Sequence, residues 1–310
     1  MPLLRPWLLA FLLTVSPGFD RAATLRVPAW IEDSPTPLGR VRFAATLNGA
    51  PAPVLAQYGP SSDQVILIVL DLTGDVSFVD PARQALIDEI GKLPANAWVG
   101  LLRAQDGLHV LADPGPDRAP VLQAIQDIAS SGKSGLLDTV EQSLSLADAM
   151  MRKSSARVSV LYITDSSVYN YRDDYTNPVI NQSDPHDLSR RFPEQLIVEK
   201  IDKLVQGVES LQPPLFVVHL HYRGSRLNEA YQSGLKTLSD ATAGDSEVCR
   251  SIAEIPTALS AMFARISSAW SLSLSLPARF HPDLRIRVAA FAGDRELQLS
   301  TRSRFTLKRK

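Results

Sequence analysis

The chain has 310 residues, of which 45% are hydrophobic and 21% are charged. This is the composition of an ordinary globular protein with room for one large or two modest domains. The formal net charge is −1, which does not indicate the clustered basic surface that nucleic-acid binding relies on, so we expect no nucleic-acid partner. We expect the basic tail at 302–310 to be a solvated strand end and terminus, with a polyanion site as the alternative.

The first residues are typical of an export signal. Arg5 precedes the apolar run 7–15, which is too short to cross a bilayer core of about 30 Å. We therefore expect residues 1–23 to be a signal peptide and the protein to be exported, either periplasmic or secreted, with no membrane span in its mature form. Cys249 is the single cysteine, so an exported chain of this sequence forms no internal disulfide and depends on its core for stability.

Three segments are predicted after the signal. Residues 24–61 hold a β hairpin around the Asn48-Gly49 turn. Residues 62–270 form an α/β domain, and residues 271–310, which alternate between apolar and polar residues, form a C-terminal antiparallel β segment.

In the central domain, apolar strands alternate with helical patterns. The expected strands are 65–71, 97–103, 157–164 and 215–221, and the expected helices are 81–93, 117–129, 136–152, 193–210, 227–241 and 256–269. This alternation predicts a doubly wound, mostly parallel, Rossmann-like sheet with helices on both faces.

Oxygen-bearing side chains follow the first long strand, in Asp71, Thr73 and Asp75. Because ligands bind beyond the carboxyl ends of parallel strands, we expect these side chains at the rim of the sheet. Asp165 follows a second long apolar strand, and Ser134 lies in the turn before a helix. Hard cations take oxygen ligands, so these five residues are candidate ligands of Mg²⁺, Mn²⁺ or Ca²⁺.

This pattern resembles the metal-ion-dependent adhesion site of von Willebrand factor type A (VWA) domains. That site reads Asp-x-Ser-x-Ser, followed by a Thr on a second loop and an Asp after a strand. The resemblance covers roughly residues 62–275 and is strongest to exported bacterial VWA-related proteins. It implies a protein-binding module, not an enzyme, in which a divalent cation bridges to a carboxylate of a protein partner.

The sequence departs from the adhesion-site pattern at three of the five positions. Thr73 in place of Ser and Ser134 in place of Thr keep a hydroxyl ligand. Asp75 instead replaces a neutral hydroxyl with a carboxylate. An added negative charge favours retention of the metal and weakens the pull of the metal on an acidic partner.

A long polar and aromatic segment, 166–191, leaves directly after the predicted site. Long loops next to a site are often functional, and Tyr and Arg are enriched in protein interfaces. The candidate partner-binding residues are Tyr169, Tyr171, Arg172 and Tyr175. An ordered insertion without a binding role is the alternative.

Two other functions fit part of the pattern. The Asp71 loop also resembles the nucleophile loop of haloacid-dehalogenase-like phosphotransferases, which would make the protein a metal-dependent phosphohydrolase. That chemistry needs a lysine and a further acidic pair, for which Lys133 and Asp173-Asp174 are the nearest residues. The third candidate is a metal-free interaction scaffold in which Asp71 and Asp165 cap helices or accept backbone hydrogen bonds.

Overall fold

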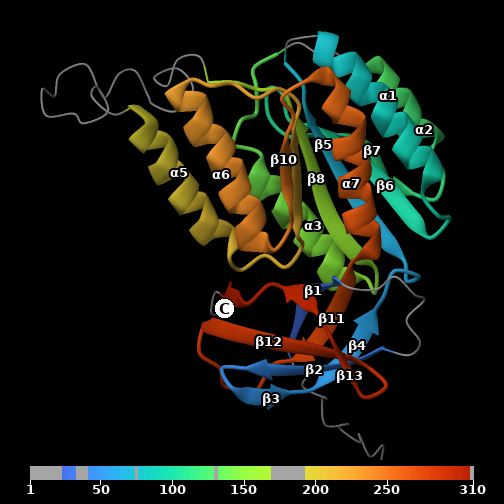
Figure 1. The fold of residues 1–310 in the computed structure, drawn as a ribbon, viewed down its shortest axis with the longest axis vertical. Coiled ribbons are helices and arrows are strands. Elements are labelled where there is room, and N and C mark those ends of the chain that lie inside the picture. The colour runs from blue at the N-terminus through green and yellow to red at the C-terminus, as the bar shows by residue number, and fades with distance from the viewer. Residues whose placement is uncertain (1–22, 33–40, 74–75, 129–131, 169–192, 308–310) are drawn as a thin grey trace, which may run out of the picture.

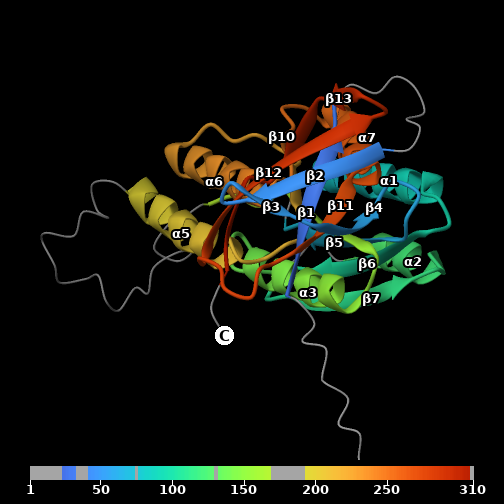
Figure 2. The same cartoon turned by 90° about the horizontal axis from the view of Figure 1, so that it is seen from below.

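The computed structural model describes residues 23–32, 41–73, 76–128, 132–168 and 193–307. A large layered α/β part adjoins a smaller part made of strands alone (Figure 1). Seen from below, the strands of the smaller part lie across the end of the α/β part (Figure 2).

The α/β part is built on one six-stranded sheet with the order β10-β9-β8-β5-β6-β7. Neighbouring strands are parallel except β6 and β7, which are antiparallel. The predicted fold class, a mostly parallel Rossmann-like α/β sheet, is confirmed. The strands are β5 (Gln64–Asp71), β6 (Ala97–Arg103), β7 (His109–Gly115), β8 (Arg157–Thr164), β9 (Leu215–His219) and β10 (Ser246–Val248).

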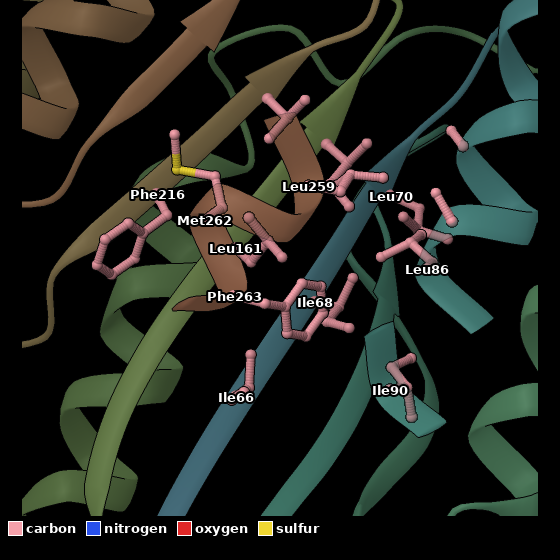
Figure 3. Close-up of a cluster of buried hydrophobic side chains, with 14 of the residues drawn as sticks. Ile66, Ile68, Leu70, Leu86, Ile90, Leu161, Phe216, Leu259, Met262 and Phe263 are labelled. Carbon is pink, nitrogen blue, oxygen red and sulfur yellow. The ribbon is translucent and has the colours of Figure 1, made fainter. Parts of the chain in front are cut away.

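Helices cover both faces of this sheet. One face packs against α1 (Val76–Lys92), α2 (Ala119–Asp127) and α7 (Ile255–Ser268), which the short 3₁₀ turn η2 (Ile252–Glu254) precedes. The other face packs against α3 (Val140–Lys153), α5 (Pro193–Val208) and α6 (Arg226–Thr242). Figure 3 shows the first of these cores, where side chains of β5, α1 and α7 interdigitate.

The alternation of side chains along the central strand β5 fixes the direction in which the Asp71 carboxylate points. All eight of its residues are buried, and successive side chains of a strand point to opposite faces. Val65, Leu67 and Val69 lie in the core on the α3 side. Asp71 continues that alternation, so its carboxylate is directed toward the loop that leads into α3.

The smaller part consists of two antiparallel sheets. Their orders are β14-β1-β11-β4 and β13-β12-β2-β3, with β15 also paired to β12. Strands that precede the α/β part pair with strands that follow it, as β1 does with β11 and β2 with β12. The strands are β1 (Thr24–Ile31), β2 (Val41–Leu47), β3 (Ala50–Ala52), β4 (Val54–Tyr58), β11 (Trp270–Ser275), β12 (Asp283–Ala292), β13 (Arg295–Leu297), β14 (Leu299–Thr301) and β15 (Arg304–Thr306).

Three buried arginines join the two parts at the end of the sheet where β5 and β8 begin. Arg26 and Arg302 come from the β part, and Arg157 is the first residue of β8. Each guanidinium donates to carbonyls at or just beyond the C-terminus of one helix, which are the groups that a helix leaves without partners and where its dipole favours a cation. The accepting carbonyls are those of Ser154 and Ala156 for Arg26, of Ile266, Ser267 and Ala269 for Arg157, and of Val208, Glu209 and Leu211 for Arg302.

Candidate metal site

Three segments that are distant in the sequence meet at the carboxyl ends of β5 and β8. The Asp71 carboxylate accepts hydrogen bonds from the backbone N–H groups of Gly135 (2.8 Å to Oδ1) and Leu136 (3.1 Å to Oδ2). The Asp165 N–H donates to the carbonyl of Asp71 at 3.2 Å. Asp71 therefore ties the loop before α3 to the ends of both strands.

Hydroxyl groups complete the surroundings of Asp71. Ser166 Oγ donates to Oδ2 at 2.8 Å, and the hydroxyls of Thr164 and Tyr162 donate to the same oxygen at 3.3 and 3.4 Å. The Asp71 side chain is fully buried. Burial raises the pKa of Asp71 to about 6, the negative charge of Asp165 adds to the rise, and the hydrogen bonds from Gly135, Ser166 and Thr164 oppose it.

Asp165 fixes the loop that carries Thr73. Its Oδ1 accepts from the Thr73 N–H at 2.7 Å and lies 3.4 Å from Thr73 Oγ1. Only 5% of Asp165 is exposed. The hydroxyl of Thr73 and a carboxylate oxygen of Asp165 are thus neighbours at the rim of the sheet.

The structure brings the described candidates together to different degrees. Asp71, Thr73 and Asp165 are joined directly by the hydrogen bonds above. Ser134 is half-buried and precedes Gly135, whose N–H contacts Asp71. The other candidates lie outside the described residues: Asp75, Tyr169, Tyr171, Arg172 and Tyr175.

The donor set at this rim suits a hard cation. Within the part of the chain that the structure describes, no three His, Cys, Asp or Glu side chains gather as a metal cluster. The rim instead combines the adjacent carboxylates of Asp71 and Asp165 with the Thr73 and Ser134 hydroxyls, all oxygen donors of the type that Mg²⁺, Mn²⁺ and Ca²⁺ take. Since Asp71 already accepts several hydrogen bonds, it is suited to holding the loops and supplying charge. Thr73, Ser134 and Asp165 are suited to direct contact with an ion.

Several residues of this network were not identified from the sequence. Ser166 and Thr164 flank Asp165 at the end of β8, so their place after a buried strand was a usable signal. Tyr162 was not identifiable, because its hydroxyl reaches Asp71 only through the pairing of β5 with β8. Gly135 contributes a backbone N–H, which no residue-type pattern reveals.

His219 supports this network from β9. Its ring is buried, and Nε2 lies 3.0 Å from the Ser166 carbonyl while Nδ1 accepts from the His221 N–H at 3.3 Å. A carbonyl only accepts and an N–H only donates, so the neutral ring carries its proton on Nε2. Burial lowers the pKa of His219 to about 4. His219 is therefore a packed, neutral residue that positions the Ser166 backbone.

Gly135→Ala should disturb the site at its anchor. An added Cβ would lie 2.6 Å from the Ala104 carbonyl oxygen and 3.1 Å from Thr139 Oγ1, so the loop or its neighbours must shift, which disturbs the Gly135 N–H bond to Asp71. We expect the free energy of unfolding, measured in urea, to fall by about 1–3 kcal/mol. The matched control is Gly91→Ala in α1, where a Cβ meets nothing within 4 Å and a gain of up to about 1 kcal/mol is expected. Equal losses in both variants would contradict this account of Gly135.

Comparisons with known proteins give likenesses of fold alone. No protein-family model matches the chain, and no curated protein matches it. Among solved structures, it is similar to a von Willebrand factor type A protein from Catenulispora acidiphila, with 12% identity and a TM-score of 0.45 over 92% of this chain and 74% of that one. It is also similar to BatB from Bacteroides thetaiotaomicron, with 12% identity and a TM-score of 0.39 over 66% of this chain and 98% of that one. A third similar structure is the PilB minor pilin from Streptococcus sanguinis, with 13% identity and a TM-score of 0.46 over 69% of this chain and 62% of that one. These similar structures include a von Willebrand factor type A protein, the kind of domain that the sequence resembles.

Proposed function

We propose that the protein is an exported, non-catalytic protein-binding module of the VWA type, in which a divalent cation at the rim of the sheet binds a carboxylate of a protein partner. The observation that carries this proposal is the convergence of the three predicted loops around Asp71, with the Thr73 hydroxyl beside Asp165. The cation would supply the positive charge that an acidic partner group needs.

Each residue of the rim has a distinct role in this proposal. Thr73, Ser134 and Asp165 hold the ion, and Asp71 fixes the two loops while adding negative charge. Asp75 contributes a further carboxylate from outside the described residues. The partner surface is completed by Tyr169, Tyr171, Arg172 and Tyr175, which also lie outside them.

Export is proposed on the signal-like residues 1–23. Among the helices of the described residues, none has both the length and the apolar character needed to cross a membrane.

A metal-free interaction scaffold is the second candidate. It is favoured by the hydrogen bonds of Asp71, whose two oxygens already accept from two backbone N–H groups and three hydroxyls. These hydrogen bonds also disfavour a phosphohydrolase, because an attacking carboxylate must reach phosphorus with a free oxygen. We therefore propose no catalytic role for Asp71.

Calorimetric titration with Mg²⁺, Mn²⁺ and Ca²⁺ separates these candidates. We expect the chain to bind at least one of the ions and the double variant Thr73→Val with Ser134→Ala to lose at least about tenfold in affinity, since each change removes only a hydroxyl. Valine keeps the backbone N–H that Asp165 holds. The control is Thr237→Val in α6, which removes a hydroxyl bonded only within its own helix, to the Ser233 carbonyl.

Two outcomes would contradict the metal proposal. Absence of binding heat, with a melting temperature that neither ions nor a chelator change, would leave the metal-free scaffold. Equal affinities in the chain and the double variant would place the ion elsewhere.

A further inference from the structure

The outer face of β12 and its neighbour β15 carries three exposed arginines. Along β12, Leu284 and Ile286 are each 2% exposed and face the core of the β part, whereas Arg285 and Arg287 are exposed. Arg304 on β15 is also exposed. We call Arg285, Arg287 and Arg304 the arginine face.

Strand register places like charges directly against each other on this face. Arg285 is the cross-strand partner of Arg304 in the β12–β15 pair, and Arg287 follows two residues along on the same side. Like charges opposite each other in an antiparallel pair are destabilising. Among the residues that the structure describes, no carboxylate lies within 4.0 Å of these three guanidinium groups. The arginine face therefore carries positive charge that the described part of the chain does not pair.

A depression of about 830 Å³ lies beside these arginines. Arg285 and Arg287 form part of its wall, and residues with small side chains from β2, the Asn48-Gly49 turn and β12 form another part. The small lining residues are Ala44, Ala45, Thr46, Gly49 and Ala289. The surface is thus hollowed where the positive charge is concentrated.

Two acidic residues lie at the borders of the arginine face. Asp283 precedes Arg285 by two residues on β12, and its carboxylate lies 3.8 Å from His281 Nδ1. Glu296 lines the depression and is the cross-strand partner of Phe291. A flat anionic membrane covering the whole face would meet both carboxylates, whereas an extended segment that crosses Arg285, Arg287 and Arg304 stays clear of Glu296, whose partner Phe291 lies four residues beyond Arg287 on β12.

We propose that the arginine face binds an acidic, extended segment of a protein partner, with carboxylates pairing to Arg285, Arg287 and Arg304. Guanidinium and carboxylate groups match in bidentate geometry, and the small residues leave room for the backbone of the segment. This surface lies on the β part, beyond the end of the sheet where β5 and β8 begin (Figure 1). It is therefore separate from the rim that carries Thr73 and requires no metal.

The test measures fluorescence anisotropy of a labelled oligoglutamate peptide titrated with the purified chain, in a chelator so that a metal at the rim cannot contribute. We expect binding that weakens as salt is added, because the charges are exposed. The double variant Arg285→Gln with Arg287→Gln should weaken binding at least about tenfold. The control, Lys153→Gln with Lys236→Gln, removes the same charge from α3 and α6 and should bind as the unaltered chain does.

Circular dichroism and melting temperature establish that both double variants are folded. Equal weakening in the two variants would show attraction by overall charge and overturn the proposal. Absence of binding to the unaltered chain would overturn it as well, as would binding to phosphatidylglycerol vesicles without binding to the peptide, which would identify a membrane contact instead.

Discussion

Arg157→Ala is expected to lower the free energy of unfolding by about 3–5 kcal/mol. The Arg157 guanidinium donates to three carbonyls that end α7, to the Pro60 carbonyl at 3.0 Å and to Gln64 Oε1 at 2.7 Å. Only 3% of the residue is exposed, and burial lowers its pKa to about 10. Removal leaves several buried acceptors without a donor, which costs more than the loss of an exposed charge.

Urea unfolding followed by circular dichroism measures this effect. Arg295→Ala provides the control, because Arg295 is an exposed residue of β13 and substitutions at such positions change stability by about 0.5 kcal/mol or less. If Arg157→Ala unfolded within that margin of the control, the helix-capping role of Arg157 would be wrong.

The three buried arginines that join the two parts also hold the elements on which the candidate metal site is built. Arg157 connects the end of α7 to the beginnings of β5 and β8, and the opposite ends of those two strands carry Asp71 and Asp165. Arg26 and Arg302 anchor α3 and α5 to the β part in the same way. The rim therefore sits on strands and helices whose far ends are fixed.

Much of the α/β part was predictable from local pattern. The expected strands 97–103 and 157–164 coincide with β6 and β8, because their apolar runs are buried on both faces and end in polar residues. The helix expected from residue 81 begins at Val76 instead and carries Pro81 inside it. Proline favours the first turn of a helix, so its presence pointed to a later start.

Two strands at the edges of the sheet were not predicted. In β7 the residues His109, Val110 and Leu111 are exposed, and Pro114 follows near its end, so the apolar run resembles a loop. With only three residues, β10 is too short to leave a pattern. Edge strands lack the continuous burial that makes central strands recognisable.

The candidate site was predictable in its members more than in its chemistry. Spacing identified Asp71 and Asp165 because each follows a long apolar strand. Backbone hydrogen bonds to Asp71 belonged to the metal-free alternative, but the sequence did not identify their donors, Gly135 and Leu136, since these depend on how the loop at 135–136 folds back onto β5. Arg26, Arg157 and Arg302 were also not identified as the residues that join the two parts, because the carbonyls that they bind lie more than 90 residues away in the sequence.

Stability between pH 4 and pH 6.5 should reveal two buried groups with opposite effects. The pKa of Asp71 rises from its ordinary value of 3.8 to about 6 on folding, so the folded carboxyl keeps its proton where the unfolded one loses it. Its contribution is present at low pH and is lost as the pH rises through about 6. The pKa of His219 falls from 6.5 to about 4, so its contribution is present above pH 6.5 and is lost as the pH falls. Each amounts to about 3 kcal/mol.

Because the two contributions oppose each other over the same range, they should largely cancel in the unaltered chain, and single substitutions should separate them. In Asp71→Asn, the free energy of unfolding should decrease relative to the unaltered chain as the pH falls from 6.5 to 4. In His219→Gln, the relative decrease should occur as the pH rises from 4 to 6. Urea unfolding at several pH values in a chelator measures both, and titration of all other groups is common to the three proteins. Parallel pH profiles for the two variants would show that these side chains are not buried as the structure has them. Opposite slopes would establish that Asp71 becomes a buried anion only above about pH 6. In that range a cation at the rim would offset the negative charge of Asp71.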